Sequence, residues 1–197
     1  MALALMLLVG AALLALATGG SWAAFSAQPF KSLRLVVIAV VAELLANGLA
    51  RASGLHGFYP TGLVLAALAA LAFCIRNVRL PGVPLIALGL FSNALVVAVN
   101  GAMPVSVTAA ARANVPVAAI ADGADPRHNI AGGGTTFRVL GDDIPLPIPV
   151  RPEVVSPGDA LIAAGIGEFV LLGMRSPRVR RTEPDSRARR SGRLAAS

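Results

Sequence analysis

Residues 92–106 read SNALVVAVNGAMPVS, a hydrophobic run with two asparagines that ends in a polar segment containing proline. No charged residue occurs between Pro84 and Val99. A helix over residues 82–100 would be ~28 Å long, close to the ~30 Å hydrocarbon thickness of a bilayer. This stretch therefore predicts a membrane-spanning helix that leads into a loop outside the membrane.

The composition of the whole chain indicates the same class of protein. Of its 197 residues, 56% are apolar and only 14% are charged, whereas charged residues make up about 25% of an average soluble domain. The mean hydropathy is +0.74. A single cysteine, Cys74, excludes an intrachain disulfide and any CxxC motif. We expect one integral membrane domain without internal repeats.

Five apolar segments predict transmembrane helices, at about residues 1–18, 33–50, 60–75, 82–100 and 158–174. The first has the hydrophobicity of a signal peptide. However, Lys31 and Arg34 follow it and no basic residue precedes it, which reverses the charge order of a cleaved signal. The expected fold class is an all-α membrane domain over residues 1–174, with the first span retained.

The long hydrophilic segment of residues 101–157 holds eight of the fourteen prolines. We expect a short helix capped by Ser106, a short strand over residues 135–140, and extended chain over residues 144–152. Apolar residues are too numerous here for a disordered loop. We therefore expect the segment to dock on the helix ends, with Asp142 or Asp143 near the start of the fifth span.

The basic residues predict the orientation. Residues 175–197 carry eight arginines and two acids, a net +6 of the total +7, and are expected to form a disordered cytoplasmic tail that attracts anionic lipid headgroups. With this tail inside, the inner segments hold twelve basic residues and the outer segments five. The N-terminus is then outside. Nucleic acid is not an expected partner, because no aromatic residues are interleaved with the tail arginines.

Two acidic residues, Glu43 and Glu168, fall inside predicted spans, where a charge costs ~3 kcal/mol. Glu43, Asn93 and Glu168 lie at ~10–17 Å from the inner surface by helical rise, and Asn47 shares a helix face with Glu43. We expect an intramembrane polar cluster of these four residues, facing the bundle interior. It would serve either as hydrogen bonding between helices or as a proton relay or substrate contact.

A second candidate site lies at the outer rim and comprises Asn100, Asp142, Asp143, Ser156 and Asp159. Ser156 and Asp159 have the pattern of a helix N-cap, which is their structural explanation. If the loop brings Asp142 or Asp143 to Asp159, the carboxylates would bind a hard cation or supply an acid of raised pKa. The irregular spacing predicts no metal site. Asp122, Asp125 and His128 indicate a surface turn.

Three short blocks resemble a known family. The sequences NGAMPVS (residues 100–106), GDDIP (141–145) and SPGD (156–159) occur in that order after an apolar N-terminal half. The chain resembles the uncharacterised bacterial membrane proteins filed as domain of unknown function 5317, over roughly residues 1–174. The stretch DGADPRHNIAGGG (residues 122–134) departs from the shorter loop that the resemblance leads one to expect. The resemblance implies the topology but no activity.

No motif for a cofactor or for a known catalytic class occurs in the sequence. We therefore expect a non-enzymatic component of the bacterial cytoplasmic membrane, which binds a partner, a lipid or a small solute through its outer loop. A protein partner would be another membrane protein or a second copy of the chain. The alternatives are a membrane-embedded enzyme that uses the outer carboxylates, and a proton-linked transport subunit that uses Glu43 and Glu168.

Overall fold

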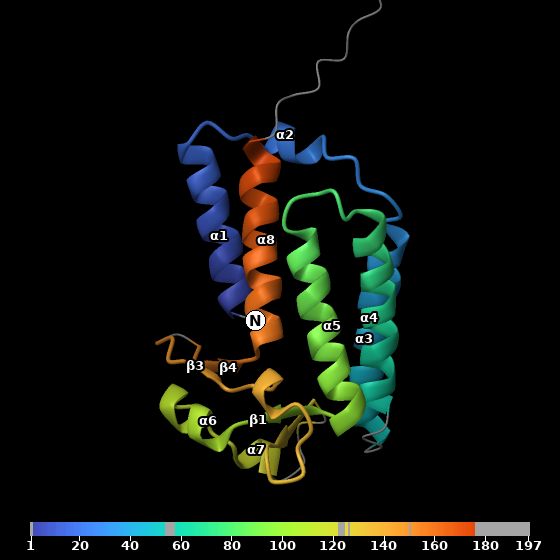
Figure 1. Ribbon diagram of the computed structural model, residues 1–197, viewed down its shortest axis with the longest axis vertical. Helices are drawn as coiled ribbons and strands as arrows, with labels where there is room; N and C mark the ends of the chain where they lie inside the picture. The colour runs from blue at the N-terminus through green and yellow to red at the C-terminus, as the bar shows by residue number, and fades with distance from the viewer. Residues whose placement is uncertain (1, 54–57, 122–124, 126, 150, 176–197) are drawn as a thin grey trace, which may run out of the picture.

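Five long helices form most of the structure (Figure 1). The computed structural model describes residues 2–53, 58–121, 125, 127–149 and 151–175, apart from the side chains of residues 47, 50, 51, 53, 58–60 and 119. The long helices are α1 (Ala2–Ala17), α3 (Arg34–Ser53), α4 (Phe58–Arg76), α5 (Val83–Asn100) and α8 (Pro157–Arg175). They lie in the order α1, α8, α5, α4, α3, each packed on the next. Two of them, α5 and α8, are long and apolar enough to cross a membrane.

Each predicted apolar segment is a helix whose ends lie within three residues of the predicted ends. The described part contains more helices than the five expected spans. The described part also contains α2 (Trp22–Ser26), α6 (Val107–Ala113) and α7 (Ala118–Ala121), of which only α6 was predicted. The α2 helix forms in the supposed linker because the Ser21 side chain accepts the N–H of Ala24 at 3.2 Å. Most of the predicted tail, residues 176–197, lies outside the described residues.

Glycines on facing sides of α5 and α8 let the two helices approach closely. A Cβ atom at Gly165 would lie 2.6 Å from the carbonyl oxygen of Gly82. A Cβ atom at Gly89 would overlap the carbonyl oxygen of Gly158 and lie 2.7 Å from a side-chain carbon of Ile162. The backbones of the two helices therefore meet where any larger residue would push them apart.

The described residues between 101 and 156, here called the cap, fold over one end of the helices (Figure 1). Strand β1 (Met103–Val105) pairs in parallel with β2 (His128–Ile130), so that Met103 lies opposite His128. Strand β3 (Ile144–Leu146) pairs antiparallel with β4 (Glu153–Val155), which leads directly into α8. The carboxylate of Glu153 also accepts the N–H groups of Ala2 and Leu3, at 3.0 and 2.8 Å. The cap is thus attached to α1, α5 and α8.

Three predictions about the cap can be compared with its structure. The helix after Ser106 is confirmed, with the Ser106 side chain accepting from the N–H of Ala109. Extended chain is confirmed at β3. The strand over residues 135–140 was wrong: Phe137 has a left-handed backbone (φ 53°) and begins the 3-10 helix Arg138–Leu140. The backbone of Thr136 is hydrogen-bonded to Asn100, which removes it from any strand pairing.

We predict that Gly89→Ala destabilises the protein, because the added methyl group collides with the backbone of Gly158 and overpacking of this kind costs ~1–3 kcal/mol. Gly10→Ala is the matched control. Gly10 also lies within a helix, but no atom of another element lies within 4 Å of its Cβ position. Thermal unfolding of the purified protein in detergent should give a lower midpoint for Gly89→Ala only. Equal midpoints for the two variants would contradict a tight α5–α8 crossing.

Candidate functional site

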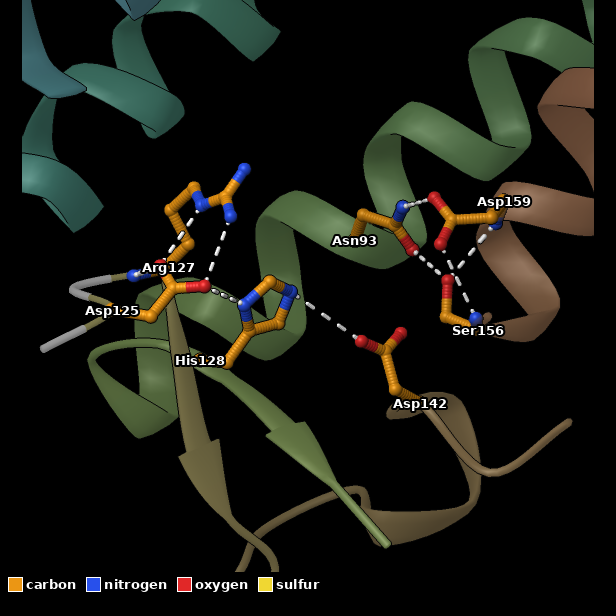
Figure 2. A network of polar contacts seen from close by, with 7 residues as sticks. All are labelled: Asn93, Asp125, Arg127, His128, Asp142, Ser156 and Asp159. Carbon is orange, nitrogen blue, oxygen red and sulfur yellow. Dashed lines mark hydrogen bonds and ion pairs between the residues drawn. The ribbon is translucent and has the colours of Figure 1, made fainter. Parts of the chain in front are cut away.

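Three polar side chains join α5 to the first turn of α8 (Figure 2). Asn93 donates from its amide nitrogen to Asp159 at 2.7 Å, and its amide oxygen accepts from the Ser156 hydroxyl at 2.9 Å. Ser156 and Asp159 also exchange backbone-to-side-chain hydrogen bonds, at 3.0 and 3.2 Å. The predicted N-cap is confirmed, with Asp159 in the position that glutamate takes in a capping box. We call these three residues the interhelix lock.

The lock is a structural element. Ser156 is completely buried, and its hydroxyl both donates to Asn93 and accepts from the N–H of Asp159. Both Asp159 carboxylate oxygens are hydrogen-bonded. Buried polar groups that are satisfied in this way hold two helices in register. Ser156 and Asp159, two members of the predicted outer-rim site, are therefore explained by the fold.

Asn100 attaches the cap to the end of α5. Its amide oxygen accepts the N–H of Thr136 and its amide nitrogen donates to the carbonyl of Thr136, both at 2.9 Å. The carbonyl of Asn100 accepts from the Asn129 side chain at 3.2 Å. This third member of the predicted rim site therefore holds the chain before the 3-10 helix.

The backbone of Asp142 is docked against β1, so the LGDD segment is not a free loop. The sequence predicted docking near the start of α8 and the end of α5, and the contact found is with the strand that follows α5. Its N–H donates to the carbonyl of Pro104 at 2.8 Å, and its carbonyl accepts the N–H of Ser106 at 2.9 Å. Val105 thus pairs with Ile130 of β2 on one edge and with Asp142 on the other. Asp143, the next residue, is exposed and does not join the site.

The side chain of Asp142 faces His128 in a small polar cluster (Figure 2). Asp142 is 5% exposed, and its Oδ2 lies 3.6 Å from Nε2 of His128. Nδ1 of the same imidazole lies 2.8 Å from Oδ2 of Asp125, which Arg127 also binds with two nitrogens at 2.9 Å. Within the described residues, Oδ1 of Asp142 is buried without a hydrogen-bond partner. We call Asp125, Arg127, His128 and Asp142 the Asp142–His128 site.

The pKa values of the two carboxyl groups that flank His128 are shifted in opposite directions. Burial raises the pKa of Asp142 to about 8, and the negative charges of Asp159 and Glu153 add to the rise. Burial acts in the same sense on Asp125, but hydrogen bonds from Arg127 and His128 outweigh it and hold its pKa well below the usual range. At neutral pH Asp125 is therefore ionised and accepts the hydrogen on Nδ1 of His128. The other imidazole nitrogen faces a carboxyl group that is largely protonated.

The geometry of the Asp142–His128 site limits its chemistry. Among the described residues, no three histidine, cysteine, aspartate or glutamate side chains are placed to hold a metal ion together. The cation site considered from the sequence is therefore not supported there. A free carboxyl oxygen beside an imidazole can instead accept an N–H or O–H group of a ligand, or exchange a proton with one.

The model of a family of unknown function (DUF5317) matches residues 27–171. The chain belongs to that family. The matched segment covers α3, α4, α5, the cap and most of α8, including the lock and the Asp142–His128 site. It begins after α1, so the family match is shorter at the N-terminus than the expected residues 1–174. No curated protein and no solved structure matches the chain.

Of the predicted intramembrane cluster of Glu43, Asn47, Asn93 and Glu168, the three residues whose side chains are described do not come together in this DUF5317 member. Asn93 is part of the lock. Glu43 is exposed on α3, and Glu168 is half-buried on α8, with α4 and α5 between the two helices. The side chain of Asn47 lies outside the described residues. No hydrogen bond or ion pair of either glutamate is found in the described part of the chain.

Sequence reasoning missed the roles of Asp125, Arg127 and His128. The turn itself was predicted, and Asp125 does accept the N–H of Arg127 at 3.0 Å in an Asx-type turn. The overlooked signal was the spacing of Asp125 and His128, three residues apart on either side of that turn. His128 reaches Asp142 because β2 and residue 142 both pair with β1, and no local sequence pattern indicates these pairings.

We predict that Asp142→Asn is more stable than the wild type at high pH. The pKa of Asp142 rises from 3.8 to about 8 on folding, so between these values the folded state holds a proton that the unfolded state has lost. The contribution of Asp142 to stability is therefore present at low pH, falls as the pH rises through this window, and is lost above about pH 8. Asparagine has nearly the shape of the protonated acid and keeps no such dependence.

Thermal unfolding in detergent from about pH 5 to about pH 9 tests this sign. The unfolding midpoint of Asp142→Asn, relative to that of the wild type, should increase as the pH rises. The two proteins differ only at residue 142, so pH effects that do not involve this residue cancel in the difference. Asp143→Asn, at the exposed neighbouring position, should follow the wild type. Parallel curves for all three proteins would show that Asp142 is ionised when folded.

Proposed function

We propose that the protein is a non-enzymatic, multi-pass component of the bacterial cytoplasmic membrane, and that its cap binds a small solute or a partner side chain at the Asp142–His128 site. The five long helices are the proposed spans, with the N-terminus and the cap outside and the C-terminus in the cytoplasm. The ligand would present an N–H or O–H group to Asp142.

The membrane location is supported by the apolar surfaces and by the distribution of charge. Leu13, Val37 and Leu44 are each more than half exposed, although they lie within helices. The end of the helices opposite the cap carries Lys31, Arg34, Arg76, Arg79 and Arg175, and residues 18–34 and 76–82 contain no acid. The cap has both signs of charge. Bilayer insertion with the basic end inside accounts for both features.

The free Oδ1 atom of Asp142 is the observation that carries the binding proposal. Buried carboxyl groups are nearly always hydrogen-bonded, because an unsatisfied one costs ~1–3 kcal/mol or more. Asp159 of the lock lies in the first turn of α8, just after β4, and both of its carboxylate oxygens accept hydrogen bonds. Asp142 uses neither for a short hydrogen bond among the described residues. A ligand donor at Oδ1 would offset this cost, so binding at this point is favoured over binding at the satisfied lock.

The position of His128 between two carboxyl groups favours a second candidate, an enzyme in which His128 transfers a proton. An ionised Asp125 would orient the imidazole as an acid–base catalyst requires. The two functions differ in what happens to the ligand. A binding protein returns its ligand unchanged, whereas an enzyme converts it and loses that activity in His128→Gln.

The binding proposal predicts that a small molecule or protein co-purifies with the wild type and is lost from Asp142→Ala. The change removes both carboxyl oxygens but keeps both backbone hydrogen bonds of residue 142. Asp143→Ala makes the same chemical change at an exposed position and should retain the ligand. The measurement is mass spectrometry of molecules that co-purify with the three proteins from membranes. Identical profiles for all three would refute a site at Asp142.

The proposed orientation predicts the activity of alkaline phosphatase fusions, because this reporter is active only outside the cytoplasm. A fusion after Ser197 should be inactive, and an insertion between residues 120 and 130 should be active. The inner segments hold twelve basic residues against five outside, which is the basis of the expectation. The reverse pattern would overturn the orientation, and activity at neither position would argue against an extracytoplasmic cap.

A further inference from the structure

An apolar groove of about 390 Å³ lies at the junction of α1, α2 and α8, away from the cap. All of its lining side chains are apolar, among them Ala12 and Leu13 of α1, Trp22 and Phe25 of α2, and Val170 of α8. Its lining on α1 runs from Leu8 to Leu16, which corresponds to ~12 Å of helix. One leaflet contributes about half of the ~30 Å hydrocarbon core of a bilayer, so the groove has the length of an acyl chain in one leaflet.

The α2 helix closes the groove because it is fixed to the C-terminal end of α8. The N–H of Ser21 donates to the carbonyl of Met174 at 2.8 Å, and the Gln28 side chain donates to the carbonyl of Gly173 at 3.2 Å. Phe25 stands edge-on between Trp22 and Phe169, with ring centroids 6.1 and 5.3 Å apart. The α2 helix is thereby held against α8, with Trp22 over half exposed at the rim.

The groove lies near the basic end of the helices, because α2, which lines it, is hydrogen-bonded to the last residues of α8. Met174, whose carbonyl holds α2, is followed directly by Arg175, an exposed residue. Lys31, Arg34, Arg76 and Arg79 belong to the same end, and residues 18–34 and 76–82 contain no acid. Two copies inserted in the same orientation would bring these like charges together, which disfavours a second copy as the occupant. An anionic headgroup complements them.

We propose that the groove binds an anionic phospholipid of the inner leaflet, with one acyl chain between α1 and α8 and the headgroup beside Arg175. The proposal rests on the membrane location proposed above. Trp22 then lies where the chain meets the headgroup, the depth that tryptophan favours at membrane interfaces. The site differs from a flat lipid-facing surface because three helices line it and Arg175 directly follows Met174, whose carbonyl holds α2.

Trp22 is the only tryptophan of the chain, so its fluorescence reports on this site alone. The full-length protein is reconstituted in phosphatidylcholine vesicles that contain a minor fraction of phosphatidylglycerol. Two preparations have the same lipid composition and the same bromine content, but carry the bromines on the acyl chains of either phosphatidylglycerol or phosphatidylcholine. Bromine quenches tryptophan on contact, so a difference between the preparations measures which lipid occupies the groove.

Brominated phosphatidylglycerol should quench Trp22 more strongly, with a local enrichment of about fivefold, the ratio that ~1 kcal/mol per cation near the surface gives. Arg175→Gln should reduce this enrichment. Ala12→Phe, which fills the groove, should make the two lipids equal, whereas Ala98→Phe on the exposed face of α5 near the cap should not.

The contrary outcomes distinguish failure of the proposed lipid site from failure of the proposed membrane location. Equal quenching by the two lipids in the wild type would mean that Trp22 contacts ordinary bulk lipid. This outcome would overturn the lipid site but not the membrane insertion. Absence of quenching by either lipid, together with alkaline phosphatase fusions that establish insertion, would mean that protein covers the groove and would also overturn it. Absence of quenching with failed insertion would remove the membrane location itself.

Discussion

The crossing of α5 and α8 is the contact on which the rest of the structure depends. Glycines at both ends of the crossing bring the backbones together, and the lock of Asn93, Ser156 and Asp159 fixes their register. Close approach alone would allow the helices to slide, whereas directional hydrogen bonds from a buried side chain permit one register. Because α8 follows the cap and α5 precedes it, this single register sets the distance that the cap must bridge.

The cap is held by backbone pairing at each end of its path. It leaves α5 as β1 and re-enters the helices through β4, and residue 142 adds a pairing on the free edge of β1. These short strands would be unstable alone. They persist because Asn100 and the lock hold their flanks to helices that are already packed. The position of Asp142 beside His128 is therefore a consequence of helix packing.

The sequence was informative where the signal is local and limited where it is not. Apolar runs located the five long helices, and the capping patterns at Ser106 and Ser156 located the helix starts to the residue. Pairing between distant segments has no such signature. Asn93 was assigned to an intramembrane cluster by counting depth along α5, yet it contacts Asp159, 66 residues away. Thr135 and Thr136 have strand propensity, but Asn100 overrides it.

Asp142 and Asp159 illustrate why composition alone could not separate the structural aspartate from the candidate functional one. Both follow a glycine, both lie at the junction of cap and helices, and the sequence placed both in one rim site. The Asp159 carboxylate accepts the backbone N–H of Ser156 and an amide N–H of Asn93 from α5, so its charge is compensated. Asp142 enters a buried position where Oδ2 lies 3.6 Å from an imidazole and Oδ1 has no hydrogen-bond partner among the residues described. The fold keeps this uncompensated carboxyl within the cap although an apolar residue there would have cost less. A carboxyl group whose hydrogen bonds are all made within the protein has no free acceptor for a ligand. A binding site therefore requires a polar group that the fold leaves unsatisfied.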